Sequence, residues 1–185
     1  LNAEKEWEGL VNSSKPWVRI GSSMCGQAVG AFGISVAIST QVSSRNLDVN
    51  IDQVGCIGLC YLEPIVDVLR PGSSRVFFGN VSGDSIDSII RYIDTGELDH
   101  DSGDIIGYLG DQEIEGLSNL KDLKGISLQR RVALKNVGNI VPGNINQYIA
   151  NDGYQALNDS LEAGKPEDVV KVMQESGLRG RGGAG

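Results

Sequence analysis

The stretch LDVNIDQVGCIGLCYLEPIVDVLRPGSSRVFF, residues 47–78, decides the fold of this chain. Its first residues, 47–52, alternate apolar and polar side chains, which is typical of a strand with one buried face. Residues 65–69 and 76–78 are two further apolar runs, and the Pro-Gly pair between them favours a tight turn. The sequence therefore predicts a strand and then a β-hairpin, with the cysteine-containing loop GCIGLC between them.

Elements on either side of this stretch extend the pattern. Residues 18–20 alternate like a strand, and a short amphipathic helix is expected before them over residues 2–11. Residues 25–42 are apolar on nearly all sides, so we expect a buried helix under the sheet, with Phe32 as a packing residue. Isoleucines at i, i+3, i+4 and i+7 over residues 86–93 predict an amphipathic helix. This order of elements predicts an α/β domain.

An acidic segment follows the last of these helices. Residues 94–122 contain nine acidic residues and five glycines, and Lys121 is their only base apart from a histidine. Such a run is typical of a solvated spacer. We therefore expect a lead-in helix over residues 1–14, the α/β domain over residues 15–98 and an acidic linker over residues 99–126.

The last part of the chain, residues 127–185, is predicted to be helical up to a glycine-rich end. Apolar spacing predicts two short helices around residues 145–149 and 154–161, and Pro166 begins a third. The third helix is expected to turn three apolar side chains inward, those of Val169, Val172 and Met173.

The run GLRGRGGAG, residues 177–185, combines five glycines with two arginines and no acid. Glycine lets backbone N–H groups approach an anion or a flat ring, and arginine adds charge and a planar group that can stack. This make-up suits a phosphorylated cofactor. A flexible glycine tail is the alternative, and composition alone leaves both open.

Charge and composition exclude several functional classes. The formal net charge is −8, which argues against a nucleic-acid partner because phosphate binding requires clustered Lys and Arg. No run approaches the roughly 20 apolar residues of a membrane helix, and the first residues lack the layout of a signal peptide. We therefore expect a cytoplasmic protein with a protein or small-molecule partner.

The three cysteines do not indicate a disulfide framework of the secreted kind. Cys56 and Cys60 stand at CxxxC spacing, and two thiolates so placed could bind one iron of a cluster. Zinc prefers a CxxC knuckle with a second pair, and a thioredoxin-type disulfide prefers CxxC at a helix start. The lone histidine, His100, is expected to be exposed and not to be a ligand.

The run QESGLRGRGGAG, preceded by RRVALKNVGNIVPGNINQYIANDGYQAL at residues 130–157, resembles the opening of the flavin-binding subunit of NADH dehydrogenases. It is most similar to the versions in NAD(P)-dependent hydrogenases and formate dehydrogenases, in which a thioredoxin-like domain precedes the flavin domain. The resemblance implies that residues 127–185 begin a truncated FMN- and NADH-binding domain. It also implies an oxidoreductase whose partners are NAD(P)H and other subunits of a multi-subunit enzyme.

The same resemblance implies which residues belong to the flavin site. Those that match the family residues lining the FMN and nicotinamide pocket are Gly180, Arg181, Gly182, Gly183 and Gly185. The parent polypeptide would pass electrons from NADH through FMN to iron–sulfur clusters, or the reverse. The rest of that domain is absent from this chain, so we expect the chain alone to be inactive and not to hold FMN tightly.

The segment GCIGLCYLEPIV resembles the later ligand loop of the thioredoxin-like two-iron ferredoxins, which have a mixed sheet flanked by helices. The resemblance implies Cys25, Cys56 and Cys60 as cluster ligands, and it places Ile20 where the fourth cysteine stands in the family. An isoleucine cannot bind iron. Two hypotheses follow: a domain that keeps the ferredoxin fold without a stable 2Fe-2S cluster and serves in docking, or a cluster held by these three cysteines.

Overall fold

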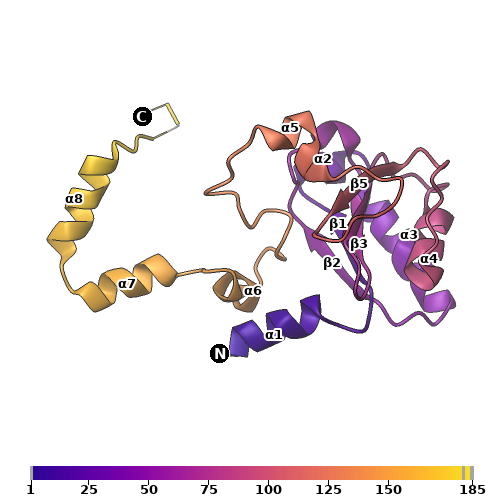
Figure 1. Cartoon of the computed structure of the whole chain (residues 1–185), viewed down its shortest axis with the longest axis horizontal. Coiled ribbons are helices and arrows are strands. Elements are labelled where there is room, and N and C mark those ends of the chain that lie inside the picture. The colour runs from indigo at the N-terminus through magenta and orange to yellow at the C-terminus, as the bar shows by residue number, and fades with distance from the viewer. Residues whose placement is uncertain (1, 181, 184–185) are drawn as a thin grey trace.

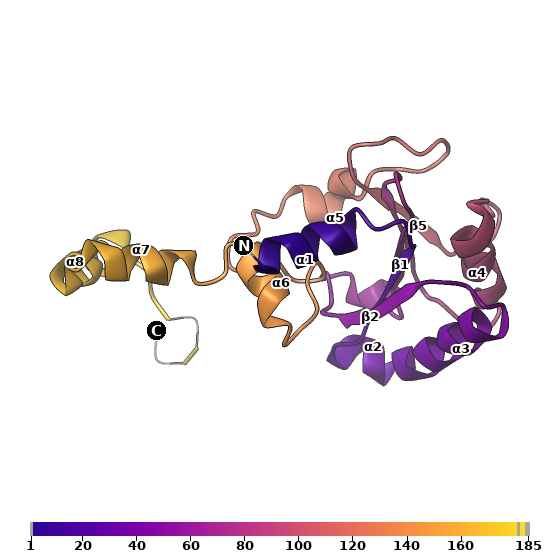
Figure 2. The same cartoon turned by 90° about the horizontal axis from the view of Figure 1, so that it is seen from below.

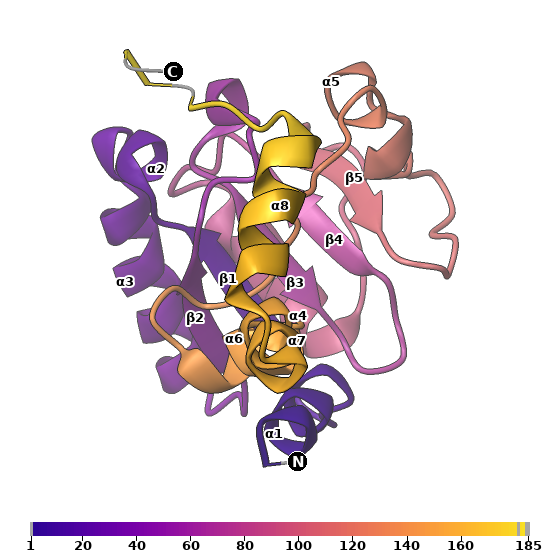
Figure 3. The ribbon, with the colours of Figure 1, turned by 90° about the vertical axis from the view of Figure 1, so that its left-hand side faces the viewer.

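Five strands form one mixed sheet. A computed structural model describes residues 2–180 and 182–183. The strands are β1 Trp17–Gly21, β2 Asn50–Val54, β3 Val66–Leu69, β4 Arg75–Phe78 and β5 Ile105–Leu109. They lie side by side in the order β2-β1-β3-β4-β5 (Figure 3). β1 pairs with β2 in parallel, and the other neighbours are antiparallel.

The described residues also form eight helices, some of which cover the two faces of this sheet. They are α1 Asn2–Val11, α2 Met24–Ala28, α3 Ala31–Ser44, α4 Ile86–Thr95, α5 Lys124–Ser127, α6 Ile145–Ala150, α7 Gln155–Ala163 and α8 Pro166–Ser176, with short 3-10 turns at Cys60–Leu62 and Leu120–Asp122. α3 and α4 lie on one side of the sheet, while α1 and α6 pack together on the other (Figure 2). The predicted α/β class, with a mixed sheet flanked by helices, is confirmed.

The alternation of side chains along β1 explains the two layers. Val18 and Ile20 are fully buried in the larger core, which also contains Ile38 of α3 and Ile89 of α4. The intervening residues of a strand point to the opposite face. Buried aliphatic side chains of this size each stabilise a fold by about 1.5–3 kcal/mol, so this layer anchors the sheet.

The predicted single helix over residues 25–42 is wrong in two respects. The chain forms two helices, α2 and α3, because Gly30 between them has a left-handed φ of 98°. The longer helix is also not buried all round, since Phe32 is 71% exposed and Val36 is 50% exposed. A helix on the outer layer of a sheet buries only one face, and here Ala31, Ile38 and Val42 form that face.

The predicted acidic spacer is wrong at two places. Residues 105–109 form β5, which pairs with β4 and completes the sheet. Leu120 is buried in a second core cluster beside Phe77. The short apolar runs inside this segment were obscured by the acids and glycines around them. This segment therefore belongs in part to the sheet domain, a name we use for residues 15–123.

The C-terminal helices form where the sequence predicts them. α6, α7 and α8 match the three expected helices, with a break at residues 151–154. The inward orientation expected for Val169, Val172 and Met173 is wrong, because all three are more than 40% exposed. Figures 1 and 2 show α7 and α8 extending away from the sheet, so no other described element covers that face.

Among the described residues, none of the helices combines the length and apolar character that crossing a membrane requires.

Two glycines test how α2 packs against the end of β1. A Cβ at Gly26 would lie 2.2 Å from the carbonyl oxygen of Gly21, whereas one at Gly33 would meet nothing within 4 Å. We expect Gly26→Ala to lower the free energy of unfolding by about 1–3 kcal/mol, because the backbone must move. Gly33→Ala, the matched control on α3, should raise it by about 0.5–1 kcal/mol. Urea unfolding of both variants checks this, and equal effects would contradict the packing described.

Candidate functional site

The parallel pairing of β1 and β2 places the three cysteines at one edge of the sheet. In a parallel pair the carboxyl ends of both strands lie at the same edge. Cys25 follows β1 at the start of α2, and Cys56 follows β2. Cys60 ends the GCIGLC loop and begins the 3-10 turn Cys60–Leu62. The Cys25 and Cys60 sulfurs are 3.4 Å apart, and the Cys56 and Cys60 sulfurs are 3.6 Å apart.

All three thiols are free, and they differ in exposure. Cys25 and Cys60 are exposed, while Cys56 is half-buried. The backbone N–H of Gly58 donates to the Cys56 sulfur at 3.3 Å, and the left-handed φ of Gly58, 93°, turns the loop back on itself. The conformation of the GCIGLC loop therefore brings its two sulfurs together.

Glu63 lies in the same region, and sequence reasoning did not identify it. Its side chain is buried, with the residue 6% exposed, and Oε2 accepts the backbone N–H of Ile65 at 2.9 Å. The carboxylate occupies the space beside Gly21 and Gly26, where a Cβ would lie about 3 Å from Oε2. Oε1 has no hydrogen-bond partner among the described residues. The one available signal was a charged residue within the apolar run YLEPIV.

Burial raises the pKa of the Cys56 thiol to about 11. Desolvation is the main cause, and the neighbouring Cys60 and the negative charge of Glu63 raise this pKa further. The N–H of Gly58 opposes them, because it stabilises the thiolate. Cys56 is therefore a protonated thiol at neutral pH and a poor nucleophile in this state.

The position predicted for the missing ligand lies in the core. Ile20 is fully buried and packs within the larger core cluster. Two residues after β1, the Ser23 hydroxyl is buried without a hydrogen-bond partner among the described residues. Across residues 2–180 and 182–183, no group of three or more His, Cys, Asp or Glu side chains is arranged so that it could hold a metal ion. The residues present thus do not fit a cluster with four thiolate ligands.

The glycine-rich end does not join the cysteines. Gly180, Gly182 and Gly183 are exposed, and a Cβ at Gly182 or Gly183 would meet nothing within 4 Å. Arg181 and Gly185 lie outside the described residues. His100 is exposed, as predicted. The candidate site that the described residues assemble is therefore the thiol site, defined as Cys25, Cys56, Cys60 and Glu63.

Comparison with known proteins shows short but strong sequence similarities. Over 57 residues, 31% of this chain and 11% of the relative, the chain is 49% identical to the NADP-reducing hydrogenase subunit HndC of Solidesulfovibrio fructosivorans. Over 41 residues, 22% of this chain and 9% of the relative, it is 49% identical to a subunit of the NADH-quinone oxidoreductase of Buchnera aphidicola. The chain thus spans about a tenth of the length of these relatives. No family model matches it.

Among solved structures, the chain is similar to a thioredoxin-like [2Fe-2S] ferredoxin from Aquifex aeolicus. The identity is 15%, the TM-score is 0.43, and the match covers 54% of this chain and 96% of the ferredoxin.

Alkylation of Cys56 in the reduced, metal-free protein tests its environment. A pKa of about 11 in place of 9.0 lowers the thiolate fraction about 100-fold at about pH 8. The more basic thiolate is more nucleophilic, and this raises the alkylation rate of each thiolate about tenfold. We therefore expect iodoacetamide to modify Cys56 roughly tenfold more slowly in the folded than in the urea-unfolded protein, by peptide mass spectrometry. The folded rate should still rise between about pH 9 and pH 11. Equal rates in both states would contradict this.

Proposed function

We propose that this chain is the amino-terminal part of an NAD(P)H-oxidising flavoprotein subunit in a multi-subunit dehydrogenase or hydrogenase. The sequence similarity to a hydrogenase subunit and to an NADH-quinone oxidoreductase subunit carries the proposal. The parent polypeptide would transfer electrons from NADH or NADPH through FMN to iron–sulfur clusters, or in the reverse direction. The partner subunits would determine which of these two directions the electrons take.

The glycine-rich run would contribute one wall of the flavin site in that parent. FMN, when bound, accepts a hydride and releases single electrons. Gly180, Gly182, Gly183 and Gly185 would let backbone N–H groups approach the cofactor, and Arg181 would supply positive charge. The open surroundings of Gly182 and Gly183 leave room for such an approach. One wall does not make a pocket, so the chain alone would be inactive.

For the sheet domain we favour a docking role for other subunits. Ile20 stands where a fourth thiolate would be needed and is instead part of the core. Beside Cys25, the outer side of α2 and α3 exposes large apolar side chains, those of Met24 (83%), Val29 (54%), Phe32 (71%) and Val36 (50%). Large apolar side chains exposed at the surface are typical of protein interaction sites. We call these four residues the α2–α3 patch.

The convergence of three sulfurs supports a second candidate role, an iron–sulfur electron branch. Cys25, Cys56 and Cys60 would hold the cluster in that case. The fourth ligand would have to be an oxygen, and the unpartnered Ser23 hydroxyl and Glu63 Oε1 are the nearby candidates. Such a cluster would pass single electrons.

Expression of the full-length gene product tests the flavoprotein proposal. We expect about one FMN per chain and reduction of ferricyanide by NADH or NADPH. Gly183→Val should lose most of the flavin, because its side chain would block backbone approach, whereas Gly33→Ala on α3 should retain it. A full-length product with neither flavin nor activity would contradict the proposal.

Iron content separates the two roles of the sheet domain. The 185-residue chain is purified anaerobically. The docking role predicts that this chain is colourless and iron-free. Bound two-iron clusters absorb between roughly 300 and 600 nm. About two irons per chain, with absorbance that Cys56→Ala removes, would refute the cluster-free role and establish the electron branch.

A further inference from the structure

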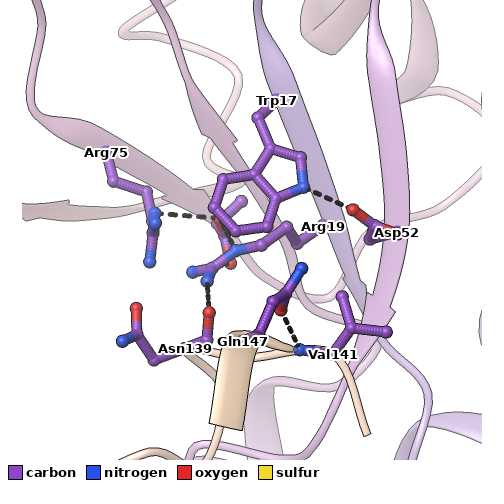
Figure 4. A network of polar contacts seen from close by, with 8 residues as sticks. Trp17, Arg19, Asp52, Arg75, Asn139, Val141 and Gln147 are labelled. Atoms are coloured by element: carbon purple, nitrogen blue, oxygen red, sulfur yellow. Dashed lines mark hydrogen bonds and ion pairs between the residues drawn. The ribbon is translucent and has the colours of Figure 1, made fainter. Parts of the chain in front are cut away.

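A buried arginine lies on the sheet face opposite α3 and α4. Arg19 of β1 is 1% exposed, and its Nε and Nη2 donate to the two carboxylate oxygens of Asp67 at 2.9 and 3.0 Å. Its Nη1 donates to the carbonyl oxygen of Asn139 at 2.8 Å (Figure 4). The guanidinium also lies over the ring of Trp17, 4.9 Å from the ring centre. Each of the three Arg19 nitrogens thus donates a hydrogen bond, and Asp67 neutralises its charge.

A second arginine shares that single carboxylate. Arg75 Nε lies 3.3 Å from the Asp67 oxygen that Arg19 already uses, which is an ion pair but not a hydrogen bond. The Arg75 side chain is 12% exposed, and its buried Nε has no hydrogen-bond partner among the described residues. Burial lowers the pKa of Arg75 to about 10, the Asp67 charge raises it, and the Arg19 charge lowers it. Two arginines thus share the Asp67 carboxylate, while the nearby Asp52 carboxylate accepts the indole N–H of Trp17 at 2.8 Å. The Arg75 guanidinium lies 5.6 Å from the centre of the Trp17 ring.

A cavity of about 250 Å³ opens beside these two arginines. Its basic wall consists of Arg19, Arg75, Arg131 and Lys135, and no acidic side chain is among the described residues that line it. Lys135 also pairs with Asp152, which is 76% exposed. The remaining wall is mainly apolar and includes Phe77, Leu109, Leu120 and Ile126. A basic, apolar-walled cavity is distinctive in a chain whose net charge is −8.

We infer that this cavity binds a small organic oxyanion. Its carboxylate or phosphate head group would be held by the guanidinium of Arg75, whose planar fork matches two oxygens at once. An apolar body would lie against Phe77, Leu109 and Leu120. The volume is small for a ligand pocket, which restricts the ligand to small molecules. This inference does not depend on the flavoprotein proposal.

The position of the cavity indicates what such a ligand would do. Val137, Gly138 and Asn139 of the segment that follows the sheet domain form part of its wall. Arg131 donates to the carbonyl oxygen of Ile57, inside the loop between Cys56 and Cys60. A bound oxyanion would therefore contact the sheet and this segment together and strengthen their attachment.

Calorimetric titration of the 185-residue chain tests the inference with three probes that share a phenyl ring and differ in the head group: benzoate, phenylphosphate and benzyl alcohol. We expect either oxyanion, or both, to bind at least about tenfold more tightly than the neutral alcohol. Which oxyanion binds identifies the head group. Arg75→Gln should weaken that binding about tenfold or more, and Arg75→Lys, which keeps the charge but not the fork, should weaken it less. Arg45 is an exposed arginine away from the cavity, so the control variant Arg45→Gln should bind the oxyanion as the unchanged protein does.

Two results would overturn the inference. One is that neither oxyanion binds more tightly than benzyl alcohol. The other is equal affinity in Arg75→Gln and Arg45→Gln, both folded by far-ultraviolet circular dichroism. If Arg75→Gln does not fold, Ile126→Trp decides: it would fill the cavity from its half-buried wall while leaving both arginines in place. Loss of oxyanion binding in Ile126→Trp supports the inference, and unchanged binding overturns it.

Discussion

The parallel pairing of β1 with β2 is the constraint on which the thiol site depends. These strands are joined through α2 and α3, and their register sets Gly21 opposite Val54 at the edge where both strands end. The residues that follow each strand must therefore meet. That is why Cys25, more than thirty positions before Cys60 in the sequence, has its sulfur 3.4 Å from that of Cys60. The antiparallel pairing of β3 with β1, with Ile20 opposite Val66, brings the start of β3 and the Cys60 turn before it to the same edge.

The face of the sheet that lies away from α3 and α4 depends on a different kind of interaction. Its centre is the ion pair of Arg19 with Asp67, which is covered by Trp17 and by the chain around Asn139. A buried pair with both carboxylate oxygens engaged contributes little net stability against an apolar alternative, but removing either partner is costly. It also fixes geometry, because Arg19 binds a carbonyl more than a hundred residues later in the chain. The segment after the sheet domain is thus joined to the sheet by specific contacts.

Much of the fold could be predicted from local patterns. The strands around Val18 and Ile51, the hairpin and the amphipathic α4 follow from side-chain spacing alone. β5 could not be predicted in this way, because its apolar run lies within a segment whose overall composition is that of a spacer. The exposure of Phe32 could not either, since an apolar helix in isolation does not reveal which of its faces a sheet will cover.

The site was predicted in part. CxxxC spacing identified Cys56 and Cys60, and resemblance added Cys25; the structure brings all three together, while their role as ligands stays a prediction. Glu63 was missed because its burial depends on the close approach of Gly21 and Gly26, which no local pattern encodes. The arginine-lined cavity was also missed. Arg19 and Arg75 are far apart in sequence and meet only across the sheet.

Thiols from two separate loops converge at one edge of the sheet, and a bifunctional thiol reagent measures that convergence. Dibromobimane, reacted with the reduced and metal-free protein and mapped by mass spectrometry, should bridge Cys25 to Cys60 as well as Cys56 to Cys60, because each pair of sulfurs is in contact. The bridge from Cys25 should disappear in urea, where only the sequence neighbours stay close. Single adducts at Cys25 in the folded protein, without a bridge to Cys60, would show that the two loops do not meet.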